Sequence, residues 1–385
     1  MQLSVIILNY NVRYFLELCV LSVQQAIQGL DAEIIVVDNN SPDDSCAMIK
    51  QRFPDVTLIE NKENSGFPKG NNIGVAAAKG RYVCILNPDT VVAEDTFTKV
   101  LAFAETQNNL GIAGVKLIDG RGQFLPESKR GVPTPWVAIT KIGGLYKLLP
   151  KQRLFNRYYA QHIKENDNGK ADILVGAFMV MKRDLYLEVG GFDEDCFMYS
   201  DDIDLSYTVL KKGLDNYYFS GTSVIHYKGE STVKDGAYMN RFREAMQFFY
   251  RKHFKQSAIF DVLMRVGAFA FAVAKKNKKA PVYNPHQYIL ISDNDVLRET
   301  LQNQLQKNVV RTTAIKKDAL FLQDNGSEVI FDNAFVNFKH ILSFMEEYRA
   351  NGFTYKIRPA NASFMLGSNS SNDRGEVVQI KKFIL

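Results

Sequence analysis

The chain has few cysteines and no long apolar run. Four cysteines occur among 385 residues, and no two of them form a C-x-x-C pair. Cysteines that lie far apart and form no such pair are typical of proteins whose thiols stay reduced, so we expect neither a disulfide nor a zinc site. No stretch approaches the roughly 18 uninterrupted apolar residues of a membrane-spanning helix. The chain starts directly in a predicted strand, and we expect no signal peptide.

Gly and Pro are not enriched, and 46% of the residues are hydrophobic, which is typical of an ordinary globular protein. A length of 385 residues exceeds one average domain and suggests two. The net charge of +5 is modest. No helix-turn-helix, zinc-finger or RNP-like pattern is present, so we expect no nucleic-acid partner.

The basic residues are unevenly distributed. Residues 128–164 contain no Asp or Glu, and their Lys and Arg residues alternate with bulky apolar ones. Residues 250–279 form a second basic stretch around a short apolar, helix-like segment. Basic residues interleaved with bulky apolar ones suit an anionic interface, and the short apolar segment either lies on a membrane surface or packs between domains. We expect peripheral contact with a membrane surface and keep interdomain packing as the alternative.

The N-terminal part alternates strands and helices. We expect strands at 3–9, 32–38, 56–60, 82–86, 171–181, 216–219 and 223–227, and helices at 12–27, 44–53, 71–78, 183–189 and 201–212. Continuous β-branched runs alternating with helices predict an α/β fold with a mainly parallel central sheet covered on both faces.

The alternation restarts near residue 286. We expect strands at 287–292, 328–331, 355–359 and 376–380, and helices at 296–306 and 337–351. This pattern predicts a small Rossmann-like α/β domain. Its first strand is not followed by G-x-G-x-x-G, so we expect a structural or partner-docking role rather than dinucleotide binding. The predicted domains are 1–240, a basic amphipathic helical segment at 241–285, and 286–385.

Polar residues follow several predicted strands, where ligands of open α/β sheets bind. Asp38 ends one strand and could accept a hydrogen bond from a pyrimidine base, or serve as a turn residue. Asp89 follows another and offers the hard oxygen that Mg²⁺ or Mn²⁺ prefers, although a helix cap or turn is the simpler role of a lone Asp. The loop 64–74 holds three Gly and three Asn, whose backbone and amides could follow a nucleotide closely.

Three carboxylates, Asp201, Asp202 and Asp204, stand at the start of a predicted helix. Acids there stabilise the helix dipole by about 0.3–1 kcal/mol each, but neighbouring carboxylates also raise one another's pKa. A general base near neutral pH is therefore plausible. His226 ends a strand, where it is either structural or a metal ligand beside a carboxylate.

Seven motifs in order resemble those of the inverting family 2 glycosyltransferases with the GT-A fold, particularly the bacterial rhamnosyltransferase-like branch. The motifs span about residues 1–255 and read V-I-I-L-N-Y-N, V-V-D-N-N-S-P-D, N-S-G-F-P-K-G-N-N, L-N-P-D, G-A-F-M-V-M-K-R, Y-S-D-D-I-D-L and V-I-H-Y-K-G.

The resemblance implies roles for individual residues. Carried over by position, the nucleoside contacts are Asn9 and Asp38, and the donor-pocket residues are Asn64, Gly66 and Asn72. The implied ligands of Mg²⁺ or Mn²⁺ are Asp89 and His226. Gly176 and Ala177 would lie near the donor sugar or acceptor, and Asp202 would be the base, supported by Asp201. Two departures stand out. The family's usual Glu-Asp pair is Asp201-Asp202 here, and the D-x-D motif of related enzymes has Asn87 in its first position, leaving Asp89 alone.

The reaction implied is an inverting displacement that moves a sugar from dTDP-rhamnose or a UDP-sugar to a glycan or a polyprenyl-diphosphate-linked acceptor in cell-surface polysaccharide synthesis. The expected location is the cytoplasm, on the inner face of the membrane. A sugar-phosphate nucleotidyltransferase should show a G-x-G-T-R-like loop where residues 9–12 read N-Y-N-V. A dinucleotide-dependent oxidoreductase should also show a glycine-rich loop after its first strand, and this chain has none there. A catalytically silent scaffold stays open, because sequence does not establish that Asp89, Asp202 and His226 converge.

Overall fold

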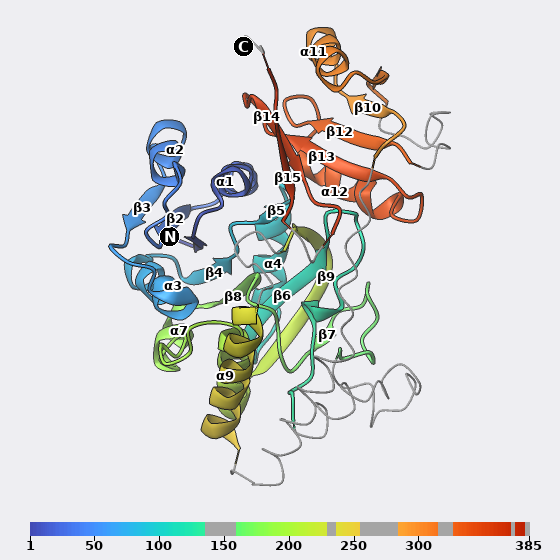
Figure 1. The fold of residues 1–385 in the computed structure, drawn as a ribbon. Coiled ribbons are helices and arrows are strands. Elements are labelled where there is room, and N and C mark those ends of the chain that lie inside the picture. Colours follow the sequence, from blue (N-terminus) through green and yellow to red (C-terminus); the bar gives the residue numbers. More distant parts are fainter. Residues whose placement is uncertain (135–158, 229–235, 255–283, 315–325, 371–373, 382–385) are drawn as a thin grey trace.

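The computed structural model describes residues 1–134, 159–228, 236–254, 284–314, 326–370 and 374–381. Most of the two basic stretches, and with them the predicted apolar segment and most of 241–285, lie outside the described residues. Two β-sheets, each with helices packed against it, make up the described part (Figure 1). None of the helices in that part is long and apolar enough to cross a membrane.

The first sheet begins with parallel strands in the order β3-β2-β1-β4. Their bounds are β1 Leu3–Asn9, β2 Ala32–Asp38, β3 Thr57–Glu60 and β4 Tyr82–Leu86. All of β1 is buried, and its alternate residues enter two different apolar clusters, Val5 and Ile7 on one face and Ile6 and Leu8 on the other. Side chains alternate across a strand, so a sheet covered on both faces produces the continuous apolar runs seen in the sequence.

The second half of this sheet continues as β8-β6-β9-β5, with β7 paired to β9. The bounds are β5 Thr90–Val92, β6 Leu110–Ile118, β7 Gly169–Lys170, β8 Phe178–Lys182 and β9 Asp215–His226. Strands β6 and β9 run in the direction of β1 to β4, whereas β5, β7 and β8 run against it. The predicted α/β class with a mainly parallel central sheet is confirmed.

Helices pack on both faces of this sheet. They are α1 Arg13–Ala26, α2 Ser45–Arg52, α3 Gly66–Ala77, α4 Thr96–Glu105, α7 Arg183–Glu188 and α8 Asp201–Lys211, with a 3-10 turn at Pro126–Ser128. A further helix, α9 Gly236–His253, packs in a separate apolar cluster with Ile203 of α8 and with Ile173. Residues of α1 and α4 enter one apolar cluster, and residues of α3 and α8 enter the other. The connections that follow β1, β2 and β4 leave from one edge of the sheet, and the candidate site lies there.

The second sheet has the order β11-β10-β12-β13-β14-β15. The elements are β10 Tyr288–Ile291, α11 Asp295–Leu305, β11 Val309–Thr312, β12 Glu328–Asp332, α12 Phe338–Glu347, β13 Thr354–Arg358, β14 Phe364–Gly367 and β15 Glu376–Gln379. Its first four strands are parallel, β14 runs against them, and β15 pairs antiparallel with β14 and so runs in the direction of the first four. The α12 and α11 helices contribute to different apolar clusters with this sheet, which gives a small α/β unit.

The two sheets share one apolar cluster, which joins α1, β5 and β9 to α12 and the second sheet. Polar contacts reinforce this junction. The Glu94 carboxylate, just after β5, accepts from the first backbone N–H groups of α12 at Phe338 and Lys339, at 2.7 and 2.8 Å. Lys116 on β6 pairs with Glu346 of α12 at 2.7 Å. The C-terminal unit is therefore docked firmly on the first sheet.

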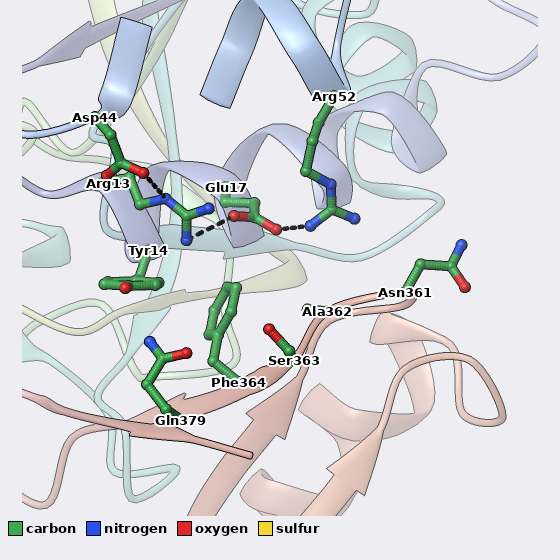
Figure 2. A pocket seen from close by; sticks show the side chains of 10 residues that line it. All are labelled: Arg13, Tyr14, Glu17, Asp44, Arg52, Asn361, Ala362, Ser363, Phe364 and Gln379. Atoms are coloured by element: carbon green, nitrogen blue, oxygen red, sulfur yellow. Dashed lines mark ion pairs between the residues drawn. The ribbon is translucent and has the colours of Figure 1, made fainter. Parts of the chain in front are cut away.

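A cavity of about 260 Å³ opens at the same junction (Figure 2). Buried Glu17 lies there between two arginines, 3.0 Å from Arg13 and in an ion pair with Arg52. The other lining residues are Tyr14, Asp44, Asn361, Ala362, Ser363, Phe364 and Gln379. The acidic and basic side chains in this wall balance, and no predicted site residue belongs to it. We therefore assign it to the domain junction.

Several predicted elements need correction. The strand expected at 171–181 is only Phe178–Lys182, because the chain around Ile173 forms an isolated bridge with Arg130 instead. The helix expected at 71–78 already begins at Gly66, inside the predicted loop. The strands expected at 216–219 and 223–227 form one strand, β9. No strand or helix was predicted at the positions of β5, α4, β6, β7, β11 and β14.

Candidate active site

Two predicted nucleoside residues lie side by side at the ends of β1 and β2. Asn9 is in register with Asp38, and its Nδ2 donates to Asp38 Oδ1 at 2.7 Å. Ser41 donates to the same carboxylate through its backbone N–H at 2.8 Å and its hydroxyl at 2.6 Å. Asp38 is only 2% exposed, so these donors hold it as an oriented acceptor. Asn9 Oδ1 is buried without a hydrogen-bond partner among the described residues.

The predicted donor loop turns into α3 at Gly66. Gly66 has a φ of +82°, and a Cβ there would lie 2.9 Å from atoms of Phe197. Asn64 Oδ1 accepts from the Gly66 backbone N–H at 3.1 Å, while Asn39 Nδ2 donates to the Gly66 carbonyl at 3.0 Å. Only glycine combines this conformation with such close approach. Asn39, which the sequence analysis did not single out, thus holds the loop together with the predicted Asn64.

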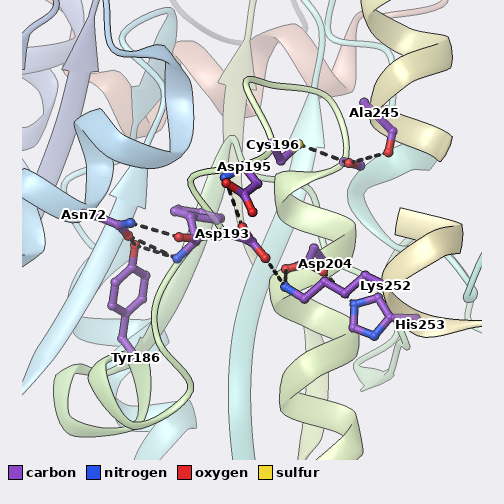
Figure 3. Close-up of polar contacts among 11 residues, drawn as sticks. Asn72, Tyr186, Asp193, Asp195, Cys196, Asp204, Ala245, Lys252 and His253 are labelled. Carbon is purple, nitrogen blue, oxygen red and sulfur yellow. Dashed lines mark hydrogen bonds and ion pairs between the residues drawn. The ribbon is translucent and has the colours of Figure 1, made fainter. Parts of the chain in front are cut away.

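Asn72 lies nearly two turns further into α3, and its side-chain amide is hydrogen-bonded to protein groups (Figure 3). Its Nδ2 donates to the Phe192 carbonyl and to Glu194, both at 2.9 Å. Its Oδ1 accepts from the Tyr186 hydroxyl at 2.6 Å and from the Phe192 N–H at 3.1 Å. The amide therefore ties α3 to the segment leading toward α8. This geometry favours a supporting role in shaping the donor pocket over direct contact with the donor.

The predicted metal ligands are neighbours. Strand pairing sets Thr90 opposite His226, which brings His226 Nε2 to 3.5 Å from Asp89 Oδ1 and 3.3 Å from Asn87 Nδ2. Asp89 and His226 are 4% and 6% exposed. His226 Nδ1 and Asn87 Oδ1 are buried without hydrogen-bond partners among the described residues. No cluster of three or more His, Cys, Asp or Glu ligands occurs in the described part of the chain.

The acidic pair begins α8. Asp202 Oδ2 accepts from Arg130 at 2.5 Å and from the Gly176 backbone N–H at 3.1 Å. Asp201 is buried, and burial together with the adjacent Asp202 carboxylate raises its pKa to about 7. The two acids therefore differ in environment: Asp202 has a cationic partner, whereas Asp201 holds a proton until near-neutral pH.

The segment containing Gly176 and Ala177 connects these groups. The Asn87 N–H donates to the Ala177 carbonyl at 3.1 Å. A Cβ on Gly176 would lie 3.4 Å from the Asp202 Cβ and 3.5 Å from the Phe67 ring, next to Gly66. The donor loop, the strand end that carries Asp89, and the acidic pair thus meet at one place. The structure thus connects Asp89 and His226, which lie side by side, through Asn87 to the segment whose Gly176 contacts Asp202.

Residues 4–190 match the family model described as Glycosyl transferase family 2. This part of the chain is therefore a family 2 glycosyltransferase domain. The N-acetylglucosaminyl-diphospho-decaprenol L-rhamnosyltransferase of Mycobacterium tuberculosis is 26% identical over 250 residues, covering 61% of this chain and 79% of that protein. Rhamnosyltransferase WbbL of Escherichia coli is 23% identical over 212 residues, covering 52% and 76%. A solved structure of mannosyltransferase PcManGT from Pyrobaculum calidifontis has 19% identity and a TM-score of 0.46, covering 73% of this chain and 76% of that one.

Asp204, the third acid at the start of α8, contacts α9 (Figure 3). It is buried and contacts the end of α9, with His253 Nε2 at 2.6 Å and Lys252 Nζ at 2.8 Å. Lys252 also reaches Asp193 at 2.5 Å. Asp204 therefore links α8 to α9 and leaves the catalytic assignment to the two preceding acids.

The contacts of three residues in the candidate site were not predicted from the sequence. Arg130 was counted only as one cation of a basic stretch, although it pairs with the predicted base. Asn87 was treated as a missing acid, yet it contacts His226. Asn39 follows Asp38 directly, so its place after a strand was the available signal. Nothing local to Arg130 could have revealed its partner, which is 72 residues away in sequence.

The raised pKa of Asp201 predicts a pH-dependent stability. An unfolded Asp loses its proton near pH 3.8, whereas the folded protein keeps it until about pH 7. Stability should therefore fall as pH rises through this window, by up to about 1.4 kcal/mol per pH unit. Asp201→Asn removes the penalty, so we expect the variant to gain thermal stability over the parent at pH 8 and much less at pH 4.5.

Asp215→Asn is a control of opposite sign, because pairing with Lys170 lowers the pKa of this partly exposed carboxyl. It should destabilise slightly at pH 8. Melting curves at the two pH values make the comparison. An Asp201→Asn difference that is the same at both pH values would contradict the assigned protonation.

Proposed function

We propose that this glycosyltransferase moves a sugar from a nucleoside-diphosphate donor to an acceptor hydroxyl with inversion at the anomeric carbon, and that Asp202 is the base. The observation that carries the proposal is the position of the Asp202 carboxylate against Gly176, beside the segment that contacts Asn87. A base at the meeting point of the donor loop and the Asp89 strand end can reach a hydroxyl that approaches the donor sugar.

The donor site comprises Asn9, Asp38, Asn64, Gly66, Asn72, Asp89 and Gly176. Asp38 and Asn9 recognise the nucleoside at the ends of β1 and β2. The Gly66 turn lets the backbone approach the sugar nucleotide closely. We favour dTDP-rhamnose, followed by UDP-sugars, because two similar enzymes are named rhamnosyltransferases.

The same residues suit a divalent cation, Mg²⁺ or Mn²⁺. Asp89 and His226 offer a carboxylate and an imidazole side by side. Asn87 Oδ1, which has no hydrogen-bond partner among the described residues, is an amide oxygen of the kind such ions also accept. Two or three protein ligands leave most of the coordination to donor diphosphate and water. When bound, the ion would supply Lewis-acid stabilisation of the leaving nucleoside diphosphate.

The chemistry of the chain's own groups is a single in-line displacement. Asp202 takes the proton of the acceptor hydroxyl as the acceptor oxygen bonds to the anomeric carbon. The bond from that carbon to the diphosphate oxygen breaks with its electron pair, and the nucleoside diphosphate leaves. Asp201, buried and protonated until near-neutral pH, adds no second negative charge at lower pH beside the base.

A thermal-shift panel tests the donor assignment. Ligands that bind only the folded state raise the melting temperature with their concentration. We expect dTDP- and UDP-sugars to raise it with Mn²⁺ present, the matched donor most of all. Mn²⁺ alone should have little effect, since Asp89 provides the only carboxylate of the proposed ligand set. A strong shift by Mn²⁺ without nucleotide contradicts the ligand set, and no shift by any nucleotide sugar contradicts the function.

For the acceptor we propose a polyprenyl-diphosphate-linked glycan, with the enzyme peripheral on the inner membrane surface. Support comes from the acid-free stretch at 128–164 and from the name of the mycobacterial enzyme. We expect the protein to float with anionic liposomes and to prefer a lipid-linked acceptor over its soluble glycan. Failure to float, together with equal use of the soluble acceptor, would overturn this part of the proposal.

A further inference from the structure

Arg130 makes the closest contact with the predicted base. Its Nη2 lies 2.5 Å from Asp202 Oδ2, and the two side chains are 13% and 12% exposed. The Gly176 N–H donates to the same oxygen at 3.1 Å. The other oxygen, Oδ1, has no hydrogen bond to any described residue. One oxygen of the carboxylate is thus anchored from two sides, and the second is left for another partner.

The backbone holds Arg130 in place for this contact. Arg130 and Ile173 exchange two backbone hydrogen bonds, each of 2.9 Å, in an isolated antiparallel bridge. Ile173 is three residues before Gly176, so the same short segment positions both donors that reach Asp202. The neighbouring Lys129 points elsewhere, since its Nζ donates to the carbonyls of Tyr159 and Ala160 at 3.3 and 3.2 Å.

We propose that Arg130 is a positioning residue for the transfer reaction, which fixes the Asp202 carboxylate through Oδ2 so that Oδ1 meets the acceptor hydroxyl. This proposal rests on the proposed role of Asp202 as base. A carboxylate anchored by a guanidinium and a backbone N–H loses most of its rotational freedom before substrate arrives. The guanidinium also neutralises one charge where two acids stand together at the start of α8.

Arginine is suited to this task because it combines a permanent charge with a planar group of directed donors. A lysine at this position would keep the charge but lose the directed geometry. An alanine would lose both and leave Asp202 held by Gly176 alone. Comparing arginine, lysine and alanine at position 130 therefore separates the effect of the positive charge from the effect of the directed hydrogen bonds.

The experiment compares Arg130→Ala, Arg130→Lys and the control Lys129→Met in steady-state transfer. We expect Arg130→Ala to lower kcat by about 10- to 100-fold with the donor KM nearly unchanged, in line with the cost of a misplaced catalytic group. Arg130→Lys should recover part of that loss. Added methylguanidinium should raise the activity of Arg130→Ala and leave Lys129→Met unaffected. Circular dichroism confirms that each variant is folded.

Three outcomes would overturn the proposal: unchanged kcat in both Arg130 variants, a raised donor KM with unchanged kcat, which indicates donor binding, or no recovery with either lysine or methylguanidinium. The double variant Arg130→Ala/Asp202→Asn separates this proposal from the function. If Arg130 acts through Asp202, the double variant transfers sugar no more slowly than Asp202→Asn alone. If Asp202→Asn itself retains full turnover, the base assignment fails. If it is inactive while Arg130→Ala is fully active, only the Arg130 proposal fails.

Discussion

Asp202→Asn should reduce kcat by about 10²- to 10⁴-fold, the usual contribution of a general base. The substitution preserves the shape of the side chain, and Asn Oδ1 can still accept from Arg130 and Gly176. What it removes is the ability to take a proton from the acceptor. Nucleotide binding in the presence of Mn²⁺ should stay nearly unchanged, because the predicted diphosphate contacts come from other strands. Turnover assays and calorimetric titration with the nucleoside diphosphate measure the two quantities.

Asp204→Asn is the matched control, with the same chemical change two residues along the same helix. Asp204 is buried against Lys252 and His253, so its substitution should lower the melting temperature. Its effect on kcat should stay below roughly tenfold, since no proton transfer depends on it. Equal losses of kcat in both variants would point to a structural role for the whole acidic cluster. Undiminished turnover in Asp202→Asn would rule out the base assignment.

The strands that carry the site were predictable because their sequences meet a strict requirement. A strand buried on both faces is almost entirely apolar, as β4 is and as β1 is apart from Ser4 and its last residue, Asn9. Polar residues at the end of such a run, or a few positions after it, then mark the edge of the sheet where ligands bind. Asn9, Asp38 and Asp89 were found by this reasoning, and the structure brings Asn9 into contact with Asp38 and Asp89 into the neighbourhood of His226.

The elements that were predicted wrongly depend on contacts between residues far apart in the sequence. The stretch before β8 is as apolar as a strand, but Ile173 pairs with Arg130, and Gly176 approaches Asp202 instead of continuing a ladder. Glycine has a poor helix propensity, so the start of α3 at Gly66 depends on two hydrogen bonds: Asn39 donates to the Gly66 carbonyl, and Asn64 accepts from the Gly66 N–H. The partners of Arg130 and Asn72 could not be predicted for the same reason. Each is positioned by a strand or loop far along the chain.

Asp89→Asn should lower kcat/KM by about 10²-fold or more, because Lewis-acid stabilisation of a leaving group is typically several kcal/mol. In the proposed ligand set Asp89 supplies the only carboxylate, and His226 the only imidazole. Replacing the acid leaves a neutral set that binds Mn²⁺ poorly even with the donor diphosphate present. The expected signature is a raised KM for both Mn²⁺ and donor, together with a lower kcat. Titrating activity against Mn²⁺ at several donor concentrations measures it.

Asn87→Asp provides the complementary change, since it adds a carboxylate beside His226 and Asp89. We expect the variant to bind Mn²⁺ more tightly than the parent when no nucleotide is present, as seen by calorimetry. A second acid would also repel the donor diphosphate whenever the ion is absent, so the dependence of donor binding on Mn²⁺ should steepen. Unchanged Mn²⁺ affinity in Asn87→Asp, with full activity in Asp89→Asn, would show that the ion is held elsewhere. The parent protein should bind Mn²⁺ only together with the donor. Its three proposed ligands are one carboxylate, one imidazole and one amide oxygen, and they need the donor diphosphate to complete the coordination of the ion.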